Sequence, residues 1–212
     1  NISSRCPNYS DISQNISMIR KRIDVIINEI LFNPRTGGYD FVELYNRSNK
    51  IIDLNQLSIL EKDVSSPSTT LEETEIAPET YLLFPQEFVV LTENPDNTQL
   101  NYFTQNAAAL LEVPSFPNFP DDGAICVLRA RNSSTIDSLS FTSKWHFALL
   151  DNEDGVSLER VDYNKPTQDK SNWHSAASTV GFATPTYQNS QFTETGITGD
   201  EIKIDPEVFT PD

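Results

Sequence analysis

Short runs of β-branched and aromatic residues, each ended by turn-forming residues, are the feature that most constrains how this chain can fold. The first run, Val25 to Phe32, ends at Asn33-Pro34, and a second, Phe41 to Tyr45, places Val42 and Leu44 on one face of a strand. Similar runs occupy residues 51–54, 57–60, 81–84, 88–92, 124–129, 136–141 and 156–161. No run sustains the 3.6-residue period of a helix. We therefore predict an all-β sandwich.

The sandwich pattern covers residues 24–191, and the flanking segments differ from it. Residues 1–23 are polar and irregular, and we interpret them as the end of something that precedes the domain. Residues 192–212 combine a linker with an alternating stretch, Glu201 to Phe209, which predicts the first strand of a following domain. Within the domain we predict long loops at 62–79, 93–123, 142–155 and 164–187, with one short helical turn at 106–112. Since residue 1 is Asn and no signal peptide is visible, we interpret the chain as a mature fragment.

Charge and hydropathy limit the classes of partner. The formal net charge is −16, and the one basic run, Arg20 to Arg22, is only three residues long. Nucleic-acid binding needs clustered Lys and Arg, so we expect no nucleic-acid partner. No stretch approaches the roughly 20 apolar residues of a membrane helix, so we expect no direct membrane insertion.

Four ordered segments together resemble a known family. They are the stretch from Asp24 to Pro34, the stretch from Tyr39 to Ser48, the stretch from Asp154 to Val161, and Asn172-Trp-His-Ser-Ala followed by Ala183-Thr-Pro and Asn189-Ser-Gln. This set is similar to the lamin-tail domain in its bacterial form, over residues 24–191. The resemblance implies an immunoglobulin-like β-sandwich with long loops and without catalytic residues, and residues 1–23 are then interpreted as the close of a preceding immunoglobulin-like module.

The resemblance also implies a setting for the chain. Bacterial members usually sit in large exported proteins beside other modules. We therefore expect a secreted or cell-surface location associated with the outer membrane, a monomeric module, and neighbouring domains of the same chain as partners. The expected function is structural or adhesive, and we expect no enzymatic activity.

Polar residues within the strand runs are interpreted as structural. Glu29, Glu43 and Glu159 lie in strands, where an exposed glutamate is disfavoured. We expect Glu43 and Glu159 to accept hydrogen bonds from Arg47, Arg160 or backbone N–H groups, and so to set strand pairing. Trp173 is predicted to be a core or corner aromatic residue. His174 is predicted to be a hydrogen-bonded residue beside it, and His146 is interpreted in the same way.

An alternative function is binding of a glycan or a protein through the loops 93–123 and 142–155. Trp145, Phe116 and Phe119 are the aromatic residues in these loops that would stack on a sugar or insert into a partner. The competing interpretation is that they fix extended loop segments onto the body of the domain. Burial of all three side chains would reject the binding hypothesis.

Three further hypotheses concern covalent and metal sites. Cys6 and Cys126 would form one disulfide in a secreted protein, or else they are two unrelated thiols. Ser138, in Asp137-Ser-Leu, matches a short bacterial O-glycosylation pattern. Asp151 and Asp154 precede a glycine and present oxygens of the kind that Ca²⁺ binds, but an ordinary acidic turn explains the same residues. We predict no cofactor and no specific metal.

Overall fold

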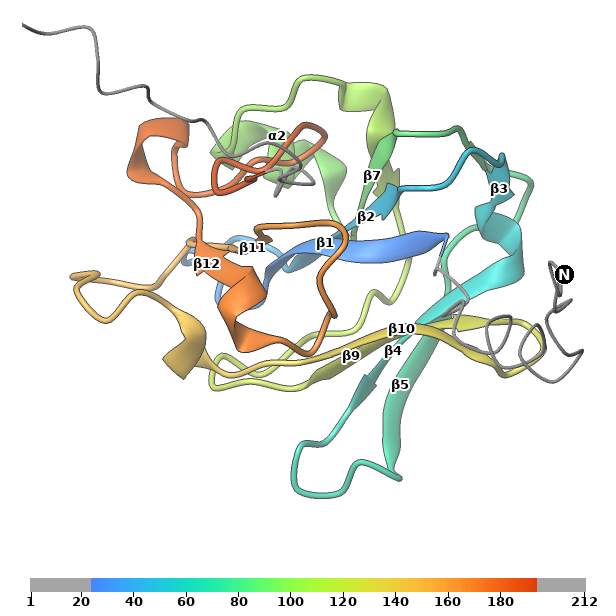
Figure 1. The fold of residues 1–212 in the computed structure, drawn as a ribbon, viewed down its shortest axis with the longest axis horizontal. Coiled ribbons are helices and arrows are strands. Elements are labelled where there is room, and N and C mark those ends of the chain that lie inside the picture. The colour runs from blue at the N-terminus through green and yellow to red at the C-terminus, as the bar shows by residue number, and fades with distance from the viewer. Residues whose placement is uncertain (1–23, 194–212) are drawn as a thin grey trace, which may run out of the picture.

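The structure is a computed structural model that describes residues 24–193, and these residues form two packed sheets (Figure 1). One sheet has six strands in the order β12-β11-β1-β2-β7-β8, and the other has four in the order β10-β9-β4-β5. A two-stranded pair, β3-β6, lies beside them. All neighbours are antiparallel except β7 and β8. The predicted all-β, immunoglobulin-like sandwich is confirmed.

Nine of the twelve strands lie in the predicted runs, whereas β5, β8 and β12 lie in segments that were predicted as loops or as a helical turn. The strands of the six-stranded sheet are β1 (Val25–Leu31), β2 (Phe41–Asn46), β7 (Phe88–Thr92), β8 (Leu110–Glu112), β11 (Leu158–Arg160) and β12 (Trp173–Ser175). The other strands are β3 (Ile52–Asp53), β4 (Leu57–Lys62), β5 (Thr70–Glu75), β6 (Leu82–Leu83), β9 (Ile125–Ala130) and β10 (Thr135–Ser140). The helical elements are α2 (Pro95–Asn101) and the 3-10 turns η1 (Leu54–Gln56), η2 (Ala107–Ala109), η3 (Ser143–Trp145), η4 (Lys170–Asn172) and η5 (Ser178–Val180).

The main hydrophobic core lies between the two sheets. Val42 and Leu44 of β2 point into it, whereas Phe41 of the same strand packs in a second cluster on the other face of the six-stranded sheet. This division is the one that the alternation of β2 predicts. The four-stranded sheet contributes Ile59 and Leu128 to the same core.

A β-bulge in β1 lets the residues before and after it face the same inner core. The register shifts between Ile27 and Glu29, so Ile27 and Ile30 both contact the inner core although they are three residues apart. Asp137 of β10 accepts a hydrogen bond from the N–H of Ile27 at 2.9 Å, which ties the bulge to the opposite sheet.

All four predicted loops contain regular structure: the loop 142–155 holds η3, the loop 164–187 holds η4, β12 and η5, and the other two hold longer elements. The segment 62–79 holds β5, whose side chains are mostly exposed and polar, so the alternation of apolar residues that predicts a strand is missing there. The segment 93–123 holds α2, which begins with Asn94 as its N-cap and Pro95 in its first turn. The predicted turn within 106–112 corresponds to η2. In the described residues, no helix is long and apolar enough to span a bilayer. The predictions for 1–23 and for 194–212 lie outside the residues that the structure describes.

Candidate functional site

Three buried glutamates lie side by side on the outer face of the six-stranded sheet. Glu29 of β1 is paired in register with Glu159 of β11 on one side and with Glu43 of β2 on the other. All three side chains are fully buried. Glutamate at such positions is disfavoured unless its oxygens are hydrogen-bonded, so the partners of these oxygens decide their role.

The partners come mainly from one stretch near the end of the described chain, residues 184–191, which we name the closing segment. Glu29 accepts from the N–H of Thr184 at 2.9 Å, and Glu43 accepts from the N–H of Thr186 at 2.6 Å. Glu159 accepts from the N–H of Gln191 at 2.9 Å. The closing segment is therefore held over the sheet by hydrogen bonds from its backbone N–H groups to the carboxyl oxygens of all three glutamates.

Side-chain donors complete the cluster. Asn28 donates to Glu43 at 2.8 Å and to Asn189 at 2.7 Å, and Asn189 donates in turn to the backbone oxygen of Asn28. Thr184 donates through its hydroxyl to Glu159 at 2.7 Å. The hydroxyl of Ser157, next to β11, donates to Glu29 at 2.5 Å. The acidic side chains thus accept hydrogen bonds from the closing segment, from β1 and from Ser157, and no arginine takes part in these contacts.

Burial changes the protonation of the cluster. Burial, followed by the nearby charge of Glu159, raises the pKa of Glu29 to about 8. Burial also raises the pKa of Glu43 and of Glu159. Near neutral pH the cluster therefore retains protons, and it acts as a hydrogen-bonded structural network with each carboxyl group engaged.

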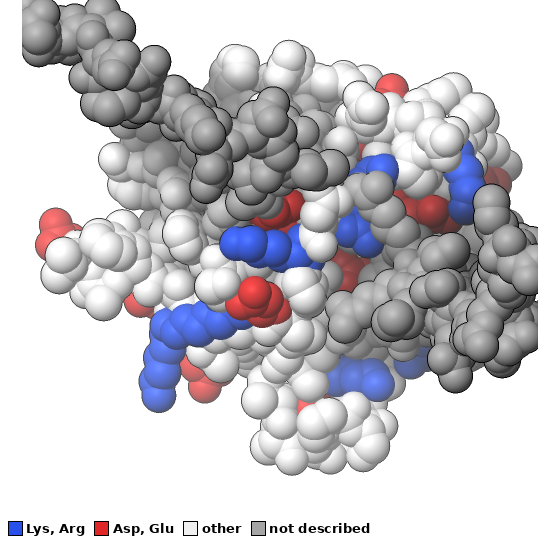
Figure 2. Space-filling view, viewed as in Figure 1, with Lys and Arg blue, Asp and Glu red and all other residues white. Residues whose placement is uncertain are grey.

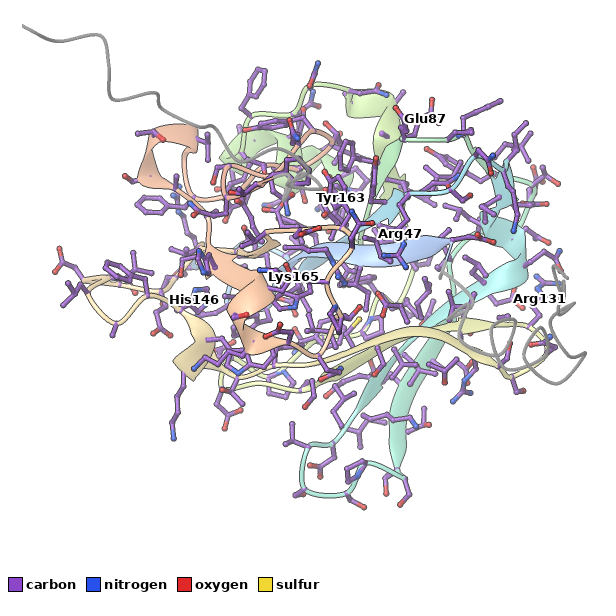
Figure 3. All side chains as sticks on the ribbon, viewed as in Figure 1. Arg47, Glu87, Arg131, His146, Tyr163 and Lys165 are labelled. Atoms are coloured by element: carbon purple, nitrogen blue, oxygen red, sulfur yellow. The ribbon has the colours of Figure 1, made fainter. Side chains whose placement is uncertain are left out.

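Arg160 does not pair with the glutamates, which corrects the predicted partnership. Its guanidinium reaches across the sandwich to Asp137 at 3.4 Å and donates to the backbone oxygen of Ile27 at 2.8 Å. Arg47 likewise donates to a backbone oxygen, that of Tyr163. Figure 3 labels Arg47 and Tyr163. The physical reason is geometric, because Arg160 points to the inner face of the sheet and Glu159 points to the outer face.

The prediction for Trp173 is confirmed, and the prediction for His174 is wrong. Trp173 is buried, lies 5.0 Å from the Arg160 guanidinium and donates from its indole nitrogen to the backbone oxygen of Thr167 at 2.7 Å. His174 is the next residue of the same strand, so its side chain points to the opposite face, where it is exposed.

His146 has the structural environment that was predicted for it. Its Nδ1 is 2.9 Å from the hydroxyl oxygen of Ser175, and its ring packs 5.4 Å from the ring of Phe32. Burial lowers the pKa of His146 to about 4, so the ring is neutral at physiological pH. Its Nε2 is buried and has no hydrogen-bond partner within residues 24–193.

Two of the three candidate binding aromatics are buried, which corrects their proposed role. Phe116 and Phe119 pack edge-to-face with centroids 6.0 Å apart, and Phe119 also packs at 6.0 Å against Phe141 in the main core. The prolines around them keep the chain extended, and the rings are the apolar groups that bind this extended segment to the body. Trp145 is only partly buried.

Trp145 lies at a groove that we name the β12 groove, with a volume of about 900 Å³. One wall is formed by residues 145–150, and the other by residues 170–178, which include β12; Phe182 and Gln191 complete it. Phe147 and Leu149 of the first wall are 60% and 80% exposed. Figure 3 labels His146 beside β12, and Figure 2 shows mostly uncharged residues along this edge of the molecule.

The family assignment rests on a sequence model of one protein family, which matches residues 20–143, more than half of the chain. The chain belongs to the Lamin Tail Domain family. No curated protein matches it. Among solved structures, a DUF4876 family protein from Bacteroides thetaiotaomicron is similar to it, with 13% sequence identity and a TM-score of 0.44, over 81% of this chain and 69% of that one.

Two features of this lamin tail domain lie beyond the matched residues. The closing segment and the β12 groove both belong to the part of the chain after residue 143. Sequence reasoning named Trp145, Trp173 and His174 but did not bring them together. The only available signal was the concentration of aromatic and histidine residues in 145–147 and 173–174.

The remaining candidates of this lamin tail domain do not assemble into a site. Asp151 and Asp154 are exposed, and within residues 24–193 no three metal-binding side chains are grouped. Ser138 lies half-buried in β10. Cys126 is a buried free thiol, whereas Cys6 lies outside the described residues. Burial raises the pKa of the Cys126 thiol, which keeps it protonated and unreactive.

A second, more polar pocket lies near β6 and β7. It is lined by Tyr81, Glu87 and several carboxamides, among them Gln105 of the 93–123 loop and Gln188 of the closing segment. It is smaller, at about 520 Å³. Figure 3 labels Glu87 at this end of the molecule.

Proposed function

We propose that this lamin tail domain is a non-catalytic structural or adhesive module of an exported bacterial protein. The observation that supports it most directly is the use of Glu29, Glu43 and Glu159. They form a cluster of neighbouring buried carboxyl groups of the kind that acid–base chemistry could use, and their oxygens accept hydrogen bonds from the closing segment. They hold a chain segment in place.

The proposal includes a setting. The module positions neighbouring domains of the same protein, is monomeric, and acts at the bacterial surface, associated with the outer membrane. The family resemblance of the sequence supports export. The net charge of −16 supports the monomeric state, because copies of the module repel one another.

Limited proteolysis tests whether the chain is a self-standing module. We expect a protected core that contains residues 24–193 and a single cooperative unfolding transition in urea. Cleavage inside this range under native conditions, or several separate transitions, would contradict the proposal. A hydrolase or nuclease screen of the same sample adds a second test, since activity that is lost on changing Glu43 or His174 would establish an enzyme.

The second candidate function is protein binding through the 142–155 loop. The β12 groove favours it, because an exposed apolar groove on a soluble domain is typical of a contact surface. Glycan binding is less well supported, because two of its three candidate aromatic residues, Phe116 and Phe119, are buried in the core. We therefore expect an array of surface glycans to give no binding that depends on Trp145. Binding that is lost in a Trp145→Ala variant would restore the glycan hypothesis.

A further inference from the structure

β12 is the outermost strand of the six-stranded sheet in the described part of the chain. In its pairing with β11, His174 lies opposite Glu159. On either side of this pair, the N–H of Ala176 donates to the backbone oxygen of Ser157, and the N–H of Val161 donates to that of Asn172. In an antiparallel ladder, residues that bond to the neighbour alternate with residues whose backbone groups point away. Trp173 and Ser175 are therefore the residues whose backbone groups point out from the edge.

The backbone groups of Ser175 remain available. The N–H of Trp173 donates to the backbone oxygen of Lys170, and this hydrogen bond ends η4; Trp173 is only 2% exposed, so its C=O is not open to another chain. The N–H and the C=O of the half-buried Ser175 have no backbone partner within residues 24–193. An open strand edge of this kind is a template for pairing with another chain.

The β12 groove runs along this edge and supplies the side-chain contacts. Phe147, Leu149 and the partly buried Trp145 form an apolar wall opposite the open backbone groups. The unpartnered Nε2 of His146, a residue that is 6% exposed, also lies in the lining. Leaving a buried polar atom unpaired is unfavourable, so this position favours a ligand that carries its own polar backbone.

The charge of the lining selects among such ligands. The chain carries 31 acidic residues and a net charge of −16, yet no Asp or Glu lines the groove. Lys170 is the one lysine or arginine in the lining. The groove is thus a neutral-to-basic surface on an acidic protein, and an acidic ligand is repelled less there than elsewhere.

We infer that the β12 groove binds an extended segment of another protein in which apolar and acidic residues alternate, and that this segment pairs with β12 as an added strand. Its backbone bonds to the N–H and the C=O of Ser175. Its apolar side chains lie against Trp145, Phe147 and Leu149, and its acidic side chains face Lys170. The inference rests on the partner contact in the proposed function and names the chemistry of that partner.

Intrinsic fluorescence provides the measurement, because the two tryptophans of the chain, Trp145 and Trp173, both line the groove. The probe is an eight-residue peptide in which isoleucine alternates with glutamate, titrated into the full chain. We expect a saturable change. A peptide in which lysine replaces glutamate, and one of the original composition with the alternation broken, should bind several-fold more weakly.

Two matched controls separate strand addition from non-specific apolar contact. Leu149→Glu should weaken binding by about tenfold or more, whereas Leu100→Glu, at a leucine that is 84% exposed on α2, should leave it unchanged. A peptide that is N-methylated at alternate residues should not bind, and the amide of Ser175 should exchange more slowly when the original peptide is present.

The inference is overturned if the alternating peptide does not bind, if the N-methylated peptide binds equally well, or if Leu149→Glu and Leu100→Glu behave alike. Protection of the Ser175 amide in the free chain would also overturn it, since the edge would then be covered by the chain itself. These outcomes are independent of the proteolysis and unfolding results, which decide whether the chain is a structural module.

Discussion

At the scale of single residues, the unusual feature of this protein is that it places three carboxyl groups in the strands of a sheet and buries them. Removing a carboxyl group from water is unfavourable, and protonation together with hydrogen bonding offsets that cost. Glu43 illustrates the arrangement, because one oxygen accepts from Asn28 and the other from the backbone of Thr186. Losing the side chain leaves the N–H of Thr186 and one of the two amide hydrogens of Asn28 buried without a partner, since Asn28 keeps its hydrogen bond to Asn189.

Glu43→Ala is therefore expected to lower the free energy of unfolding by about 2–4 kcal/mol, from the unpaired donors and from the cavity that is left. Urea unfolding followed by circular dichroism measures the change. Glu72→Ala is the matched control, because Glu72 is an exposed strand glutamate on β5, and its stability should stay close to that of the unmodified chain. Equal effects of the two substitutions would show that the cluster has no special structural role.

Gly123 is a second position where a single residue matters. Its φ is +128°, and a Cβ there would lie 2.3 Å from the backbone oxygen of Phe141. Gly37 also has a positive φ, of +78°, but a Cβ there would meet no atom within 4 Å. We expect Gly37→Ala to cost about 1 kcal/mol of conformational strain and Gly123→Ala to cost clearly more. A thermal unfolding midpoint for Gly123→Ala at or above that of Gly37→Ala would contradict this explanation.

At the scale of elements, polar contacts of Asp137 join the two sheets through the core. Arg160 of β11 and Asp137 of β10 are both buried, and Asp137 also holds the bulge of β1 through the N–H of Ile27. Burial lowers the pKa of Arg160 to about 10, which still leaves it charged at neutral pH. The pair therefore sets how β10, β11 and β1 lie relative to one another.

Arg160→Met should lower stability by about 3–5 kcal/mol, because it leaves the carboxylate of Asp137 buried without its ionic partner. Chemical denaturation gives the value. Arg131→Met is the control, since Arg131 pairs with Glu75 at the exposed surface, at 3.4 Å, and such pairs contribute little. Figure 3 labels Arg131 at the far end of the molecule. If both variants lose the same small amount, the cross-sheet pair does not hold the sandwich together.

At the scale of the whole molecule, the glutamate cluster makes stability depend on pH. Glutamate titrates near 4.3 in an unfolded chain, whereas the folded pKa of Glu29 is about 8. The contribution of Glu29 is fully present below the unfolded value and is lost as the pH rises through about 8. His146 has the opposite sign, because its folded pKa is about 4, but its contribution no longer changes once the pH is well above 6.5.

The free energy of unfolding is therefore expected to fall between pH 6.5 and 8.5, by up to about 1.4 kcal/mol per pH unit for each proton involved. Glu29→Gln should reduce this slope, and Glu72→Gln should retain it. Urea denaturation at constant ionic strength across this range measures both. Stability of the unmodified chain that is flat or rises with pH here would show that the cluster is already ionised in the folded state.

The local pattern of the sequence was sufficient for the sandwich and for the positions of nine of its twelve strands. The alternation in 41–45 predicts which residues of β2 face the core, because the side chains of a strand point alternately to its two faces. The turn residues that bound the runs predict where most strands end. Trp173 and the structural role of the strand glutamates were also accessible, since a large aromatic residue and an in-strand carboxyl group each indicate burial with polar partners.

Other features are decided only when the chain is folded. β5 has polar, exposed side chains and exists because β4 offers it an edge, so nothing in its own sequence predicts it. The partners of Glu43 and Glu159 come from the closing segment, more than 140 residues and about 30 residues away in the chain, respectively. The β12 groove brings 145–150 beside 170–178. Periodicity reports that a residue is buried, but the atoms against which it is buried are chosen by tertiary packing.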